Sequence, residues 1–200
     1  APQSLFKVNP GKSLVNTTGQ DSLIFGTAVF NNEGYISAGF FTGEAEDTMY
    51  NRGAMNITND FVQSGISWNK STGSICCGQS FIIGQDMIND GSIKSTMLIN
   101  SDNGTGTGGR FCVSGSLINT GVFSGTIDVC DATPNQFNDI NGTMTLTVTT
   151  CSVGPCSTCL PNSIAQHQQP VLTIGLTPNP FTAALQLSIE NANGKIKLQL

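Results

Sequence analysis

Short apolar runs, many of them β-branched, alternate with polar residues along most of the chain, and turn residues interrupt them every few positions. Examples are SLIFGTAVF, STMLIN and GTMTLTVTT. Apolar residues at every second position are typical of strands with one buried face. No segment keeps the i, i+3, i+4 spacing of a helix over three turns. The pattern therefore predicts an all-β protein.

A loose internal repeat accompanies these runs. Four stretches, FNNEGYIS, FVQSGISW, MINDGSIK and LINTGVFS, each place an apolar residue four positions before a glycine. These glycines recur roughly every 30 residues, a quasi-period that indicates stacked supersecondary units. They are Gly34, Gly65, Gly91 and Gly121. We therefore expect each period to form a coil of two or three short strands.

Stacked coils would bring the polar residues of the repeat into register. Asn32, Asn89 and Asn119 are expected to lie above one another, with Gln63 as the odd member, in a ladder in which each side-chain amide bonds the next. Such a ladder, together with glycine in tight turns, predicts a parallel β-helix, or solenoid, of short repeats. An antiparallel β-sandwich with Gly- and Asn-rich hairpins is the open alternative, because it would have a similar composition without a true repeat.

The pattern divides the chain into three parts. Residues 1–160 are expected to form the repetitive β domain, residues 161–170 a linker without an apolar pattern, and residues 171–200 a partial β segment for sorting or assembly. Two alternating strands flank the turn NANG in the last part, which predicts a C-terminal β-hairpin appendage. The apolar residues of these two strands are Leu185, Leu187, Ile189, Ile196, Leu198 and Leu200.

Charge is scarce in this chain. Charged residues make up 10% of it, against about 25% in an average globular protein. A net charge of -5 with only two arginines, Arg52 and Arg110, predicts no nucleic-acid partner. No run reaches the roughly 18 apolar residues of a membrane-spanning helix, so no membrane insertion is expected.

The first residues and the cysteine count indicate export. APQSLFKVNPGK has neither an initiator Met nor an apolar signal core, which is typical of a mature chain after signal removal, although a sequence that simply begins late would read the same. Seven cysteines fit an oxidising compartment. We therefore expect a secreted or cell-surface protein.

Residues suited to catalysis are few. The only histidine, His167, lies in the predicted linker, and the acidic cluster at residues 43–47 lies between turn signals, as expected of a charged loop. Asp128, Asp131 and Asp139 lack the regular spacing of a dedicated calcium loop. The sequence predicts no catalytic residue, no metal and no cofactor.

The cysteines form two pairs and a group of three, which are Cys76 and Cys77, then Cys112 and Cys130, then Cys151, Cys156 and Cys159. Disulfides explain them better than a redox motif or half a zinc site, because partner histidines are lacking. One disulfide is expected between Cys112 and Cys130, since the segment between them contains two apolar runs and the turn INTG. The odd total leaves one cysteine over, and spacing leaves the other pairings open.

The C-terminal segment at residues 171–200 carries a specific resemblance. Pro178, Asn179, Pro180 and Phe181, followed by an alternating strand, Gly194 and another alternating strand, resemble the opening of the C-terminal sorting domain found on cargo of the type IX secretion system in Bacteroidota. Sorting domains of that family continue for several more strands than this chain has. The resemblance implies export across the outer membrane to the surface or the medium, with the secretion machinery as a partner.

The same resemblance directs attention to glycosylation. Proteins exported in this phylum are commonly O-glycosylated at Asp-Ser/Thr followed by an apolar residue, and the chain contains DSL and DTM. The resemblance therefore implies O-glycosylation at Ser22 and Thr48.

These features together predict a secreted or cell-surface structural protein, either an extracellular fibre subunit or an adhesin stalk, glycosylated and without catalysis. Its expected partners are copies of itself, joined into a filament when the strand at residues 195–200 pairs with an edge of another chain, and surface glycans. The alternatives are a carbohydrate-binding module, which needs exposed aromatics on one face, and a β-helix enzyme acting on polysaccharides. The chain has one tryptophan, Trp68, and two tyrosines, Tyr35 and Tyr50.

Overall fold

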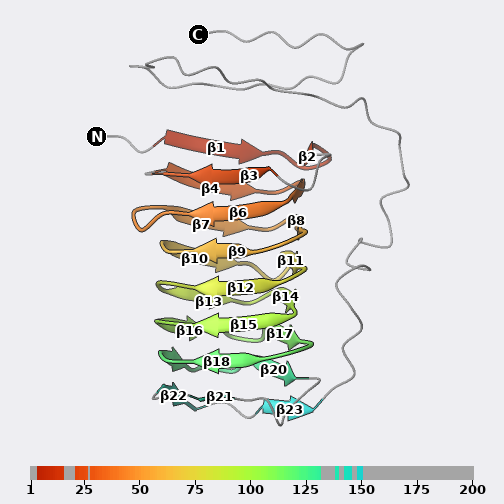
Figure 1. The fold of residues 1–200 in the computed structure, drawn as a ribbon. Coiled ribbons are helices and arrows are strands. Elements are labelled where there is room, and N and C mark those ends of the chain that lie inside the picture. The colour runs from red at the N-terminus through yellow and green to blue at the C-terminus, as the bar shows by residue number, and fades with distance from the viewer. Residues whose placement is uncertain are drawn as a thin grey trace, which may run out of the picture.

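The computed structural model of the chain describes residues 4–15, 21–26, 28–131, 138–139, 142–145 and 148–150. Their strands stack into three sheets that enclose one core, and each coil adds one strand to each sheet (Figure 1). Every strand pairing within these residues is parallel. The predicted parallel β-solenoid is confirmed, and the antiparallel sandwich is wrong.

The three sheets are named A, B and C in the order in which the chain visits them. Sheet A consists of β1 (Ser4–Val8), β4 (Ala28–Asn32), β7 (Thr48–Asn51), β10 (Ile66–Asn69), β13 (Met87–Asn89), β16 (Asn103–Thr105), β19 (Val122–Phe123) and β22 (Thr143–Met144). Sheet B consists of β2 (Ser13–Val15), β5 (Tyr35–Ala38), β8 (Ala54–Ile57), β11 (Ser74–Cys77), β14 (Ser92–Ser95), β17 (Arg110–Val113), β20 (Asp128–Asp131) and β23 (Val148–Thr150). Sheet C consists of β3 (Ser22–Phe25), β6 (Phe40–Gly43), β9 (Phe61–Gln63), β12 (Ser80–Ile83), β15 (Met97–Asn100), β18 (Leu117–Asn119) and β21 (Asn138–Asp139).

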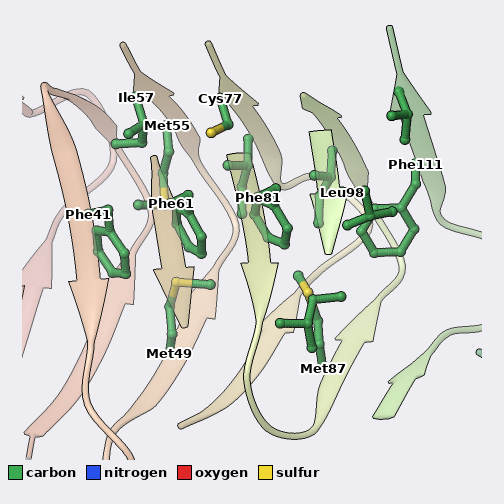
Figure 2. Packing of buried hydrophobic residues seen from close by; sticks show 14 of the residues in the cluster. Phe41, Met49, Met55, Ile57, Phe61, Cys77, Phe81, Met87, Leu98 and Phe111 are labelled. Carbon is green, nitrogen blue, oxygen red and sulfur yellow. The ribbon is translucent and has the colours of Figure 1, made fainter. Parts of the chain in front are cut away.

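The alternation seen in the sequence builds the core directly. Successive side chains of a strand point to opposite faces, so the apolar residue of each pair turns inward. Equivalent positions of successive coils then lie in columns. Phe41, Phe61 and Phe81 form one such column in sheet C, with ring centroids 4.5 and 4.6 Å apart and nearly parallel planes. Figure 2 shows these rings beside the other buried side chains of the cluster.

The true repeat is one coil, which is shorter than the period expected from the sequence. A column of glycines, one from each of five successive coils, marks the corner between sheets A and B. From the second member on, the backbone amide after the glycine donates to the glycine carbonyl of the coil before, for example Ala54 to Gly34 at 2.9 Å. The members are Gly34, Gly53, Gly73, Gly91 and Gly109.

The expected period of roughly 30 residues is therefore wrong. Gly34 and Gly91 lie at the corner between sheets A and B, whereas Gly65 and Gly121 lie at the corner between sheets C and A. Each interval thus measures one coil plus one or two further strands. Glycine is needed at these corners because coils approach closely: a Cβ at Gly53 would collide with the carbonyl oxygen of Gly34.

An amide ladder exists, but its membership differs from the predicted one. Asn32, Asn51, Asn69 and Asn89 end successive strands of sheet A, and each Nδ2 donates to the Oδ1 of the next at 2.8 Å. The predicted members Asn119 and Gln63 belong to a different column, at the end of the sheet C strands, where Asn100 Nδ2 donates to Asn119 Oδ1 at 2.8 Å. The expected period of roughly 30 residues is longer than one coil and therefore assigned residues of both columns to a single ladder.

Gln63 is the weak point of the sheet C column. Its side chain is buried, yet neither Nε2 nor Oε1 has a hydrogen-bond partner. The position above it in the next coil is Ile83, which is also buried. An amide buried without partners costs free energy that an aliphatic side chain does not.

We therefore expect Gln63→Ile to stabilise the protein by about 1–2 kcal/mol. Urea denaturation followed by circular dichroism measures the change. Asn119→Ile, in the same column, is the matched comparison and should destabilise the protein, because it removes both the nearest acceptor of Asn100 Nδ2 and the donor to the Thr143 carbonyl. Unchanged or lower stability of Gln63→Ile would contradict the prediction.

The predicted linker at 161–170 and the segment at 171–200, with its expected hairpin, lie outside the described residues. Within the residues that are described, no helix is long and apolar enough to cross a membrane.

Candidate functional site

The outer face of sheet A carries the most distinctive group of side chains in the described structure. The outward column of this sheet contains Asn31, Tyr50, Trp68 and Ile88 in register. Tyr50 and Trp68 are neighbours, with ring centroids 4.9 Å apart in an edge-to-face arrangement. Both side chains are partly exposed. Two of the three Tyr and Trp residues of the chain therefore meet on one face.

Two cations stand beside the aromatic pair. Each A strand turns toward sheet B at the same point of its coil, so Arg52 follows Tyr50 by two residues, and Lys70 follows Trp68 by two. Lys70 Nζ lies 4.2 Å from the centroid of the Trp68 ring, a cation–π contact. Arg52 Nη1 donates to Asn31 Oδ1 at 3.5 Å. We call Tyr50, Trp68, Arg52 and Lys70 the aromatic-cationic patch.

A carboxylate borders this patch. Glu33 lies 2.8 Å from Lys7 Nζ and 3.7 Å from Arg52 Nη1. The hydrogen bond from Lys7 lowers the pKa of Glu33, with smaller contributions from Asn31 and from the charges of Lys7 and Arg52, against a partial opposing effect of desolvation. Lys7 is the nearer partner of this carboxylate, so Arg52 and Lys70 give the patch a local positive charge on a chain of net charge -5.

Residues expected to carry O-glycans lie elsewhere. Ser22 is exposed on β3. Thr48 is partly buried on β7, and the residues on both sides of it, Asp47 and Met49, are almost completely buried. The carboxylate of Asp47 accepts hydrogen bonds from the backbone amides of Ala28 and Glu44 at 2.8 Å. An enzyme that reads the folded chain reaches the Ser22 tripeptide more easily than the Thr48 one, and modification of either stays a prediction.

The same two hydrogen bonds explain the acidic cluster at residues 43–47. It connects β6 to β7, as expected of a loop, and the Asp47 side chain fixes the turn instead of facing another carboxylate.

The cysteines separate into inner and outer positions on sheet B. Cys77 lies in the core, and its Sγ lies 2.9 and 3.0 Å from the carbonyl oxygens of Asn59 and Ser80, either of which accepts from its single S–H. Cys76 belongs to the outward column of the sheet, which also contains Cys112 and Cys130 as neighbours in register, yet the side chains of Cys76 and Cys130 are buried.

The expected disulfide between Cys112 and Cys130 is wrong: Cys130 is disulfide-bonded in the structure, whereas Cys112 forms no disulfide. The partner of Cys130 is therefore a cysteine other than Cys112. Non-reducing peptide mapping is expected to find Cys130 joined to such a cysteine. Cys151, Cys156 and Cys159 lie outside the described residues, as do His167, Pro178, Asn179, Pro180, Phe181 and Gly194.

Metal ligands do not gather in the part of the chain that is described, where no group of three or more His, Cys, Asp or Glu side chains could hold an ion. Asp128, one of the three aspartates considered for calcium, instead pairs with Arg110: its Oδ2 lies 2.6 Å from Nη2 and 2.7 Å from Nε.

Sequence reasoning missed the patch because it used the wrong period. Tyr50 and Trp68 are separated by one coil, as are Arg52 and Lys70. A search at the correct period would therefore have placed each pair side by side.

Comparisons with models of protein families, with curated protein sequences and with solved structures gave no match to this chain.

Proposed function

We propose that this chain is a secreted or cell-surface structural protein, an extracellular fibre subunit or the stalk of an adhesin, without catalysis of its own. The observation that carries the proposal is the continuity of the coils: three parallel sheets of eight, eight and seven strands run side by side through the described residues. The likeness of the C-terminal segment to a type IX sorting domain in Bacteroidota supports export.

Such a body is suited to bear load and to span distance. Eight strands at a spacing of about 4.8 Å give sheet A a length of about 34 Å along the stacking axis. Each coil contacts mainly its neighbours, so the length grows with the number of coils while the cross-section stays constant. Backbone hydrogen bonds connect each coil to the next along that axis, and the asparagine ladder adds side-chain bonds between four of them.

The same geometry supports the proposal that this chain forms filaments. Solenoid ends are strand edges, which accept a further strand unless they are blocked. Leu5 on β1 and Ile24 on β3 belong to the outermost described strands of sheets A and C, and each is 62% exposed. We propose that the strand at residues 195–200 of another copy adds to a solenoid edge, and that repetition of this contact without closure builds a fibre.

Electron microscopy of the complete chain and of a chain that lacks residues 171–200 tests this function. We expect elongated assemblies from the complete chain and short single rods from the truncated one, with sedimentation velocity reporting the same difference. Filaments that persist without residues 171–200 would contradict the role of that segment. A complete chain that stays monomeric at every concentration would contradict the fibre proposal itself.

A second candidate function is carbohydrate binding, and the Tyr50–Trp68 pair favours it. Aromatic side chains combine an apolar ring face with polar groups at the edge, and the C–H face of a sugar ring packs on such surfaces. The two rings lie on adjacent coils of one sheet, with an edge of one toward the face of the other, and offer an extended sugar chain two neighbouring aromatic contacts. An adhesin stalk with a sugar-binding face would combine both functions.

A further inference from the structure

We infer that the aromatic-cationic patch on sheet A binds a carboxylated polysaccharide. Trp68 and Tyr50 would contact the sugar rings, and Arg52 and Lys70 the carboxylates. This inference rests on the second candidate function above and names its ligand class.

The aromatic half of the patch is fixed in place by the fold. Tyr50 and Trp68 sit in adjacent strands of one sheet, in register, and each is flanked by a buried asparagine of the ladder. The edge-to-face contact holds one ring against the other. Little conformational entropy remains to be lost on binding, because the strands order the backbone and the edge-to-face contact orders the two rings.

Arg52 and Lys70, the cationic half of the patch, remain able to bind a carboxylate. The Arg52 side chain is 46% exposed, and its charged partner, Glu33, lies nearer to Lys7 than to the guanidinium. A guanidinium presents donors in a planar fork that matches the two oxygens of a carboxylate. Lys70 forms no salt bridge with any described residue and rests on the Trp68 ring. A carboxylate can draw this ammonium away from the ring face, which Lys70 must leave before a sugar ring packs there.

The surrounding charge limits the site to these coils. Asp90 follows Lys70 at the same corner of the next coil, and Glu33 precedes Arg52 in the coil before. A dense polyanion would meet these carboxylates on both sides. Two adjacent cations between two anions suit a sugar chain with one weak charge per residue and an apolar ring face, which describes a uronic acid polymer.

The single tryptophan provides the test. Trp68 is the only one in the chain, so its fluorescence reports directly on the patch. The complete protein is titrated with a galacturonic acid oligosaccharide, a neutral glucose oligosaccharide and a sulfated oligosaccharide of equal length. We expect a saturable change with the galacturonic acid probe, and weaker binding of the neutral probe by about tenfold, as expected when charge-assisted hydrogen bonds are lost.

Matched variants are available for both halves of the patch. Arg52→Gln should weaken binding of the galacturonic acid probe by about tenfold. Arg110, the other arginine of the chain, lies on sheet B, so Arg110→Gln should leave binding of this probe unchanged. Tyr50→Ala should weaken all sugar binding, whereas Tyr35→Ala, on the outer face of sheet B, should not. Circular dichroism melts confirm that each variant is folded.

The outcomes distinguish recognition of carboxylates, which is the inference, from carbohydrate binding in general, which is the candidate function on which it rests. Equal binding of the neutral and galacturonic acid probes, with no effect of Arg52→Gln, would overturn the carboxylate assignment and leave carbohydrate binding standing. Tighter binding of the sulfated probe would also overturn it. No change in fluorescence with any probe, together with no retention of the protein on immobilised polysaccharide, would reject both, while the structural function is judged by microscopy alone.

Discussion

Phe61→Ala is expected to lower the free energy of unfolding by about 3–5 kcal/mol, the largest loss that we expect from one substitution. The Phe61 ring is fully buried and stacks on Phe41 below and on Phe81 above. Alanine would leave a cavity between two rings that cannot move toward each other, because the strand spacing fixes their positions.

The loss should also change the form of the transition. Each coil is stabilised mainly by its two neighbours, so a cavity in the middle weakens the coupling between the coils on its two sides. Urea denaturation followed by circular dichroism should show a lower midpoint and a broader transition. Phe40→Ala is the matched control, since Phe40 lies next to Phe41 on the outer face of β6 and is only partly buried. Equal losses from Phe61→Ala and Phe40→Ala would show that the ring stack has no special role.

Asn51→Leu is expected to cost about 2–5 kcal/mol, even though it replaces a polar side chain by an apolar one inside the protein. Asn51 accepts from Asn32 and donates to Asn69 at 2.8 Å. Leucine would remove both bonds and leave a buried donor on one neighbour and a buried acceptor on the other. Unsatisfied buried groups of this kind are more costly than the lost bonds themselves.

Denaturation of Asn51→Leu is compared with that of Asn103→Leu. Asn103 also donates to a side chain in an adjacent coil, the carboxylate of Asp86 at 2.7 Å, but it is exposed. Water replaces that bond, so we expect a change within about 1 kcal/mol for Asn103→Leu. Similar values for the two variants would mean that burial of the ladder does not matter.

Prediction from the sequence succeeded where the chemistry is local. Alternation of apolar and polar residues fixes which side chains turn inward, and amides near glycines indicate a ladder. The coil length was missed because one corner varies: Asn51 precedes Gly53 by two positions, but Asn69 precedes Gly73 by four. A longer corner changes the spacing between equivalent residues of successive coils. Glycines from two different corners were then grouped into one repeat of incorrect period.

The candidate site was even harder to predict from the sequence than the coil length. Nothing in the local sequence distinguishes Tyr50 and Arg52 from ordinary outward residues of a strand and its turn. They gain meaning only when the register places Trp68 and Lys70 beside them. Register depends on the length of every corner along the way, which is set by how tightly the backbone packs between coils and not by the residues of the site.

The asparagine ladder gives the solenoid an electrical direction. Every amide in it donates toward the C-terminal coils, from Asn32 to Asn89, and the shorter series from Asn100 to Asn119 points the same way. At its first member the ladder accepts from the Gly34 amide, and at its last it donates to the Arg110 carbonyl. Aligned amides polarise one another. Copies stacked head to tail would keep their dipoles aligned, whereas head-to-head or tail-to-tail contacts would oppose them. A fibre of this protein is therefore expected to be polar, with two ends that grow at different rates.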